Sequence, residues 1–131
     1  MSYYLNEPVG KRFLLAYQIE YYCRVDGHVP FEEWFKSLGD IEAKAIVRTR
    51  LNRVQIGNFG DCKPVRGGVH EIRIDFGPGY RVYFGKIGLT LVLILCGGSK
   101  KNQAKDISLA ITFLADYKKR KKEAKNADKK A

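Results

Sequence analysis

Apolar and polar residues alternate along Val69–Phe76 and again along Tyr80–Phe84, which is the two-residue period of strands with one buried face. The intervening Gly77-Pro78-Gly79 is typical of a turn, so the pattern predicts a hairpin. If the apolar set is buried, the alternate residues turn outward onto one shared face, because neighbouring strand residues point to opposite sides of a sheet. The outward set consists of Glu71, Arg73, Arg81 and Tyr83.

Two further segments have the composition of strands. Tyr17–Val25 is rich in β-forming residues and precedes an Asp-Gly pair, which predicts a first strand. Leu89–Cys96 is a continuous apolar run, as expected of a strand that is covered on both faces or lies centrally in the sheet.

Three segments have helical spacing of apolar residues. Residues 31–38 and 41–57 predict two helices, with Trp34 in the core and Asp40 as the N-cap of the second. A last helix is expected from Gln103, with Asn102 as its N-cap. One face of the second helix is basic and fits either a solvated surface or a binding surface. Its cations are Lys44, Arg48 and Arg50.

The order strand, helix, helix, three strands and helix predicts a small α+β domain. The connections after Gly68 are too short for parallel crossovers, so the three late strands should form an antiparallel meander. Two helices from the N-terminal half and the C-terminal helix should pack on this sheet. We expect one domain over residues 18–117, an irregular arm over 1–17 and a basic tail over 118–131.

Composition narrows the class of protein. A chain of 131 residues with 45% hydrophobic residues fits one globular domain. No segment has the length of a membrane span or the form of a secretory signal, which predicts a cytoplasmic protein. Cys23, Cys62 and Cys96 have neither a disulfide nor a zinc-site spacing. The common cofactor motifs do not occur, so we expect no cofactor and no metal.

The chain is basic, with a formal net charge of +10. Residues 118–131 hold eight Lys/Arg and two Asp/Glu, and therefore account for more than half of this charge. Such a balance favours an anionic partner such as nucleic acid, through phosphate neutralisation and counterion release. The tail by itself fits a solubilising segment equally well.

The candidate functional residues are cations in loops and on the outward hairpin face, with possible proton-transfer groups among them. They fit an RNA phosphate as ligand. The cations are Lys63, Arg66, Arg73, Arg81, Lys100 and Lys101, and the other candidates are Glu71, His70, Tyr80 and Tyr83.

These residue types suit RNA cleavage without a metal. A ribose 2′-hydroxyl can attack the neighbouring phosphate if a base removes its proton, cations neutralise the phosphorane and an acid protonates the leaving oxygen. Arg73 and Arg81 are the first candidates for charge stabilisation. Glu71 or His70 could serve as the base, although His70 fits a structural histidine as well and Glu71 could pair with Arg73. The acid could be Tyr83, Tyr80 or Lys100.

The run GVHEIRIDFGPGYRVYF, followed by LILCGGSKKNQAKDISLA, resembles the HigB-type addiction-module killer proteins of the RelE/ParE toxin superfamily. The upstream run FEEWFKSLGDIEAKAIVRTRLNRVQIGNFGDCKPV also fits their pattern. The resemblance covers about residues 18–117. It implies a RelE/ParE-like fold and a type II toxin, usually a ribosome-associated mRNA endonuclease. It also implies a partner, an antitoxin of helix-turn-helix type encoded next to the toxin.

Several site residues carry over from the resemblance. Arg81 matches the arginine of the GYR motif, Arg73 matches a preceding strand arginine, and Lys100-Lys101 matches a basic pair. The chain departs from the pattern at QAKDIS, where RelE-like nucleases often have a catalytic tyrosine. Two alternatives therefore stay open: a ParE-like inhibitor of DNA gyrase without nuclease activity, and a non-catalytic RNA-binding protein.

Overall fold

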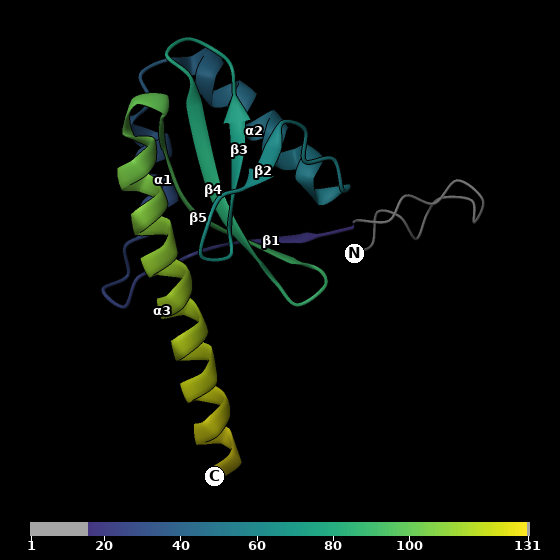
Figure 1. Cartoon of the computed structure of the whole chain (residues 1–131), viewed down its shortest axis with the longest axis vertical. Coiled ribbons are helices and arrows are strands. Elements are labelled where there is room, and N and C mark those ends of the chain that lie inside the picture. The colour runs from purple at the N-terminus through teal and green to yellow at the C-terminus, as the bar shows by residue number, and fades with distance from the viewer. Residues whose placement is uncertain (1–15, 131) are drawn as a thin grey trace, which may run out of the picture.

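The α+β class is confirmed by a computed structural model, which describes residues 16–130. Within them, one five-stranded sheet has the order β1-β5-β4-β3-β2, and three α-helices pack on it (Figure 1). The strands are β1 (Gln18–Tyr21), β2 (Cys62–Pro64), β3 (Val69–Ile74), β4 (Tyr80–Ile87) and β5 (Leu91–Ser99). The helices are α1 (Pro30–Ser37), α2 (Ile41–Gln55), the short 3-10 helix η3 (Lys100–Asn102) and α3 (Gln103–Lys130).

The predicted antiparallel meander is confirmed for β3, β4 and β5. The complete sheet is mixed, however, because β1 pairs with β5 in parallel, with Gln18 opposite Leu91. The first strand is also shorter than the predicted Tyr17–Val25 and ends at Tyr21. A strand that was not predicted, β2, forms in the turn-rich connector and pairs with β3, with Lys63 opposite Glu71.

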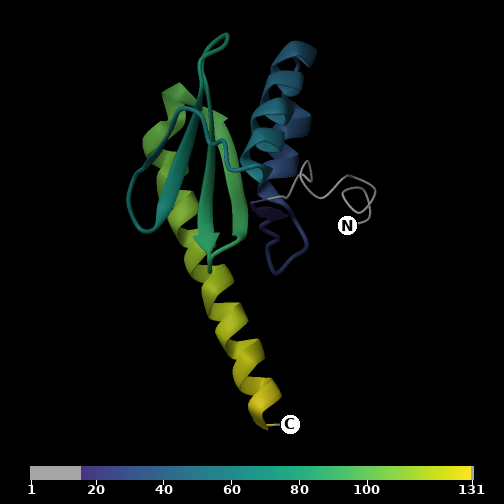
Figure 2. The same cartoon turned by 90° about the vertical axis from the view of Figure 1, so that its right-hand side faces the viewer.

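The sheet lies between two helical layers (Figure 2). Helices α1 and α2 cover one face, where the apolar hairpin residues Ile72, Ile74, Val82 and Phe84 are buried. Helix α3 covers the other face through Ala110, Leu114 and Tyr117. This second layer makes the prediction of an outward-facing polar set wrong: Glu71 and Tyr83 are 0% exposed and Arg81 is 8% exposed. These residues do share a face, but α3 packs on it.

Most predicted features of the helices are confirmed. Asn102 is an exception: it was predicted to cap the last helix but lies in η3, and its side-chain amide donates to Oγ of Ser99 at 3.5 Å. Asp40 caps α2, since its carboxylate accepts hydrogen bonds from the backbone N–H groups of Glu42 and Ala43. The stripe Ala43, Val47, Leu51 and Val54 is buried. Trp34 packs against the core on the α1 side.

Two adjacent glycines of β5 allow the helices on both faces to come close. A Cβ added at Gly97 would collide with the ring of Trp34 in α1, and one at Gly98 would collide with the carboxylate of Asp106 in α3. The Gly97-Gly98 pair therefore sets how near both helical layers lie to the sheet.

The predicted arm falls largely on residues 1–15, which lie outside the described residues. Of the remainder, the N–H groups of Ala16 and Tyr17 both donate to the carbonyl oxygen of Gln55. The predicted basic tail continues α3 without a break as far as Lys130. Within residues 16–130, no helix combines the length and the apolar character that crossing a membrane requires.

Candidate functional site

The hairpin places two arginines directly opposite each other. Arg73 of β3 pairs with Arg81 of β4, and both side chains lie on the α3 side of the sheet. Like charges in a cross-strand pair repel and destabilise a sheet unless a counter-charge is near. The arrangement therefore needs an anion.

Glu71 supplies this anion from within the protein. Its Oε1 accepts a hydrogen bond of 3.0 Å from Nε of Arg73 and lies 3.9 Å from Nε of Arg81. Burial by itself raises the pKa of Glu71, but the hydrogen bonds from Arg73 and Gln103 outweigh burial and hold this pKa below its usual value. Glu71 is thus a buried carboxylate that compensates one positive charge and orients both arginines.

The start of α3 completes the network. Nε2 of Gln103 donates a hydrogen bond of 2.7 Å to Oε2 of Glu71. Tyr83 lies opposite Glu71 in the sheet. Burial, and after it the Glu71 carboxylate, raises the pKa of Tyr83 well above its usual value. Tyr83 therefore holds its proton tightly, which makes it a poor acid.

The two arginines line an open pocket of about 320 Å³ at the end of the hairpin. Its walls come from four places in the chain: the connector before β2, strand β3 with its turn, strand β4 and η3. The lining residues are Asp61, Arg73, Asp75, Gly77, Pro78, Gly79, Arg81 and Lys100. Three cations and two carboxylates thus face one cavity.

A backbone hydrogen bond positions Lys100 at this pocket. The N–H of Lys100 donates to the carbonyl oxygen of Gly79 at 3.0 Å, which joins η3 to the hairpin turn. Gly79 has φ +83°, and a Cβ there would approach the Cβ of Lys100 to 3.3 Å. Glycine at this position thus permits both the turn and the close approach of Lys100.

Arg50 of α2 binds the loop that contributes Asp61 to the pocket. Its guanidinium donates to the carbonyl oxygens of Arg73 at 2.7 Å, Phe59 at 3.2 Å and Asp61 at 3.4 Å. The N–H of Arg73 also donates to the carbonyl oxygen of Asp61 at 2.9 Å. The second helix therefore fixes the loop that carries Asp61 beside β3.

The remaining predicted residues lie away from the pocket. Tyr80 is buried on the α1 side of the sheet, near Trp34. His70 also belongs to the α1–α2 face, where its ring stacks on Phe84 with centroids 5.1 Å apart. Burial, and after it the nearby Lys86, lowers the pKa of His70. Neither ring lines the pocket at the end of the hairpin.

Three of the predicted cations are exposed at the surface outside this cavity. Lys63 lies on the edge strand β2, Arg66 donates a hydrogen bond of 3.0 Å to Oγ of Ser108, and Lys101 lies in η3. They extend the basic surface but do not line the pocket. Of the ten predicted site residues, the pocket brings together Arg73, Arg81 and Lys100, with Glu71 behind them.

Four residues outside the ten predicted site residues contribute to the site: Asp61, Asp75, Gln103 and Arg50, the last of which was named only as part of a basic helix face. The sequence could have indicated Asp75, because this residue follows Arg73 by two positions and so lies on the same face of the strand. No such indication exists for Gln103 and Arg50, since their partners are 32 and 23 residues away in sequence.

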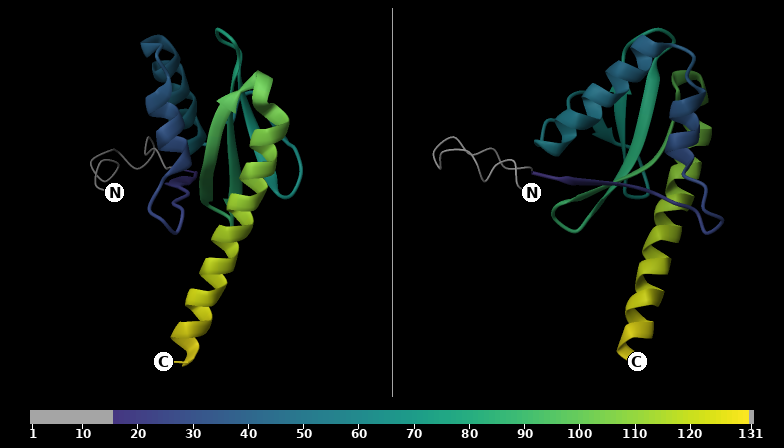
Figure 3. Two further views of the ribbon diagram at one scale, coloured as in Figure 1. Left: turned by 90° about the vertical axis from the view of Figure 1, so that its left-hand side faces the viewer. Right: turned by 180° about the vertical axis from the view of Figure 1, so that it is seen from behind.

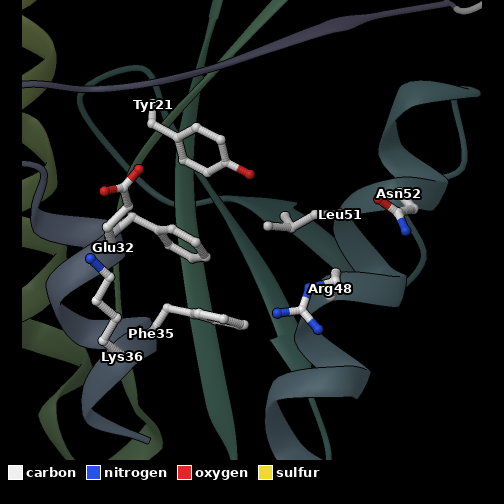
Figure 4. Close-up of a pocket in the computed structure, with 8 residues that line it drawn as sticks. Tyr21, Glu32, Phe35, Lys36, Arg48, Leu51 and Asn52 are labelled. Carbon is white, nitrogen blue, oxygen red and sulfur yellow. The ribbon is translucent and has the colours of Figure 1, made fainter.

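A second cavity of about 220 Å³ lies between α1 and α2, on the other face of the sheet (Figure 4). Tyr21, Phe31, Phe35 and Leu51 give it an apolar floor, while Glu32, Lys36, Arg48 and Asn52 supply polar groups. Its mainly apolar lining suits an apolar side chain. The charged hairpin pocket is therefore the better candidate for chemistry on an anion.

The hairpin pocket can bind an anion with two or more oxygens. Two guanidinium groups, which stay charged, and one ammonium group provide hydrogen-bond donors, and guanidinium forks match phosphate oxygens. Carboxylates beside these cations can accept a proton, and the Lys100 ammonium can donate one. The arrangement thus combines charge stabilisation with candidate groups for proton transfer.

Comparison with known proteins finds a relative in Haemophilus influenzae. The chain is 49% identical over 80 residues to this protein, which is described only as an uncharacterized protein. The match covers 61% of this chain and 81% of the relative. No family model matches the chain. With this identity and coverage, the chain belongs to the same family as the Haemophilus influenzae protein.

Proposed function

We propose that this protein is the toxin of a type II toxin–antitoxin pair, a HigB-type member of the RelE/ParE superfamily. It acts in the cytoplasm as a metal-independent endoribonuclease that cleaves mRNA on the ribosome and so inhibits translation. Its RelE/ParE-like fold is part of the proposal, which the α+β sheet with two helices on one face and one on the other supports.

The observation that carries the proposal is the convergence of Arg73, Arg81 and Lys100 on one pocket. Glu71 compensates one of these charges from behind the arginines. With Asp61 and Asp75 counted, the formal charges of the site balance, so the proposal depends on the converging guanidinium and ammonium donors. These donors favour an anion more strongly as negative charge accumulates on it. A phosphodiester that becomes a dianionic phosphorane is such a ligand.

The reaction is a transesterification within the RNA strand. The 2′-oxygen forms a bond to phosphorus and gives its proton to a base, while the bond from phosphorus to the 5′-oxygen breaks and that oxygen takes a proton from an acid. The products are a 2′,3′-cyclic phosphate and a 5′-hydroxyl end. Arg73 and Arg81 stabilise the phosphorane oxygens.

The pocket supports a narrower proposal for the proton-transfer groups than the sequence does. Lys100 is the proposed acid, because it lines the pocket whereas Tyr80 and Tyr83 do not. Asp75 or Asp61 is the proposed base, since Glu71 is already engaged with Arg73 and Gln103. Removing each carboxylate separately, as Asp75→Asn and Asp61→Asn, distinguishes the two bases by the larger loss of rate.

Expression of the chain under a tight promoter, followed by mapping of mRNA 5′ ends, tests the proposal. We expect growth arrest and new 5′-hydroxyl ends within translated regions. Arg81→Lys keeps the charge but removes the fork, and should reduce cleavage by about 10²–10³, as loss of one transition-state donor does. Lys36→Gln, a change of an exposed lysine of α1, is the matched control and should cleave normally. Folded protein that arrests no growth and cuts no transcript would refute the proposal, and RNA binding without cleavage would indicate a non-catalytic RNA-binding protein.

One observation favours a second candidate function, inhibition of DNA gyrase. No tyrosine lines the hairpin pocket within residues 16–130, in contrast to the RelE-like nucleases that the sequence resembles. ParE-like proteins of that superfamily poison the topoisomerase and cut no RNA. Supercoiling by purified gyrase in the presence of the protein separates the two functions, because a nuclease leaves supercoiling unchanged.

The proposal includes an antitoxin of helix-turn-helix type as protein partner. The short reading frame next to the gene is the candidate, and its coexpression should restore growth. Coexpression of an unrelated helix-turn-helix protein is the control and should leave growth arrested.

A further inference from the structure

The last part of α3 extends beyond the body of the protein (Figures 1 and 3). Tyr117 is the last residue of this helix that packs in the core. From Lys118 to Lys129 every side chain is exposed except Arg120, which is half-buried. Arg120 anchors the start of the extension by donating to Asp116 and to the carbonyl oxygen of Cys23. The Lys121 ammonium lies 5.4 Å from the ring centroid of Tyr117, and the side chains from Lys122 to Lys129 are all exposed.

Four lysines follow one line along this extension. Lys118, Lys122, Lys125 and Lys129 are spaced by four, three and four residues, and at 3.6 residues per turn they fall within an arc of about 60°. Their Cα atoms span about 16 Å along the axis. We name these four residues the lysine stripe.

The lysine stripe forms none of the ion pairs found within residues 16–130. The helix dipole favours cations near a C-terminus, whereas like charges three and four residues apart repel one another. The alignment of four lysines on one line therefore adds repulsion that scattered lysines would avoid, which points to a ligand outside the chain.

The other side chains of the extension define what kind of ligand fits. They include Ala124, Asn126 and Ala127 and the acids Glu123 and Asp128, so no large apolar side chain follows Tyr117. A helix that binds a membrane surface needs a broad apolar face, and one that enters an apolar groove needs large anchors. A row of exposed ammonium groups without either fits a polyanion with regularly spaced charges.

We propose that the lysine stripe binds the phosphate backbone of double-helical RNA. The choice of RNA rests on the proposed function. Gln103, at the start of α3 beside the hairpin pocket, is 15 residues before Lys118, which is about 22 Å along the helix. A double helix spans this distance as one rigid body, so a single RNA can occupy both places without having to be ordered first. A second contact on the same molecule raises the effective concentration of substrate at the pocket.

Salt dependence of binding to a 20-base-pair RNA duplex tests the proposal. The duplex carries 2′-O-methyl groups, so it cannot be cleaved and binding is measured independently of nuclease activity. The variant changes Lys118, Lys122, Lys125 and Lys129 to Gln, which keeps helix propensity. Each lost phosphate contact reduces the steepness of log K against log salt by about 0.7–0.9. We expect a reduction of about 3, and an unchanged slope would overturn the proposal.

A control variant with the same net charge separates the effect of lysine position on RNA binding from the effect of total charge. It combines Lys125→Ala with Ala124→Lys and Lys129→Ala with Ala127→Lys, and so moves two lysines to the opposite side of the helix. The stripe predicts a slope reduced by about 1.5, from two lost contacts. Binding equal to that of the unchanged protein would overturn it in favour of net charge alone.

Two further measurements separate RNA contacts from helix unfolding and from membrane binding. Far-UV circular dichroism should show equal helix content in all three proteins, so that lost binding reflects lost contacts. Vesicles containing phosphatidylserine should bind much more weakly than the duplex at the same salt, and stronger binding to vesicles would overturn the proposal. If the protein cleaves no RNA but the stripe variant still loses duplex affinity, the proposed nuclease function fails and the stripe remains.

Discussion

The side-chain amide of Gln103 donates a hydrogen bond of 2.7 Å to Oε2 of Glu71, and so joins the first residue of α3 to the middle of β3. Gln103→Leu leaves this buried carboxylate oxygen without its donor, which costs about 1–3 kcal/mol in the free energy of unfolding. Urea denaturation at pH 7 measures the loss. Gln18→Leu, on an exposed position of β1, should stay within about 0.5 kcal/mol of the unchanged protein. Equal stability of the two variants would contradict the role of Gln103.

The low pKa of Glu71 predicts a loss of stability in acid. The folded state holds this pKa below 4.5, so the carboxylate stabilises the protein above pH 4.5 and the contribution is lost as pH falls through the folded pKa. Glu71→Gln removes the titrating group, and its unfolding free energy should depend less on pH below 4.5. Urea denaturation on either side of pH 4.5 measures the difference. Glu32→Gln, at an exposed site of α1, is the control, and a Glu71→Gln variant with unchanged pH dependence would count against the buried network.

Neighbouring lysines offer a matched test of the pocket. Lys100 lines it and Lys101 does not. If Lys100 donates the proton to the leaving oxygen, Lys100→Met should lower the cleavage rate by about 10²–10⁴, while Lys101→Met should change it little. Equal losses in both variants would assign the two lysines to RNA binding and leave the acid unassigned.

At Gly98 the addition of a single methyl group should lower the stability of the protein substantially. A Cβ there collides with the Asp106 carboxylate, so Gly98→Ala should force α3 away from the sheet and destabilise the protein by about 1–3 kcal/mol. Thermal unfolding measures the effect. At Gly39 a Cβ meets no atom within 4 Å, so Gly39→Ala serves as the control and should be nearly neutral. A Gly98→Ala protein as stable as this control would mean that the helix adjusts at little cost.

Strand parity was the part of the site that the sequence could predict. Alternation correctly places Glu71, Arg73, Arg81 and Tyr83 on one face, because parity depends only on local geometry. Whether that face meets water depends on α3, whose packing is decided far away in the chain. The same limit applies to Arg50, which reads as a surface cation on a basic helix face but donates to the backbone around the pocket.

The two edge strands, β1 and β2, also could not be fully predicted from local sequence. β1 has the composition of a strand, but nothing local indicates that its partner is β5 or that the pair is parallel. β2 is three residues long and ends in Pro64, so its composition resembles a turn more than a strand. Such pairings are decided by the complete fold.

The pairing of Gln18 with Leu91 has a consequence for how the chain acquires its activity. The first strand can complete its edge of the sheet only after the last strand has left the ribosome, and Gln103 reaches Glu71 later still. A partly synthesised chain can therefore contain Glu71 and both arginines of the hairpin without Gln103, which donates to the Glu71 carboxylate. Chains that terminate upstream of Gln103 lack the Gln103–Glu71 hydrogen bond, so the charged network behind the pocket is completed only late in translation.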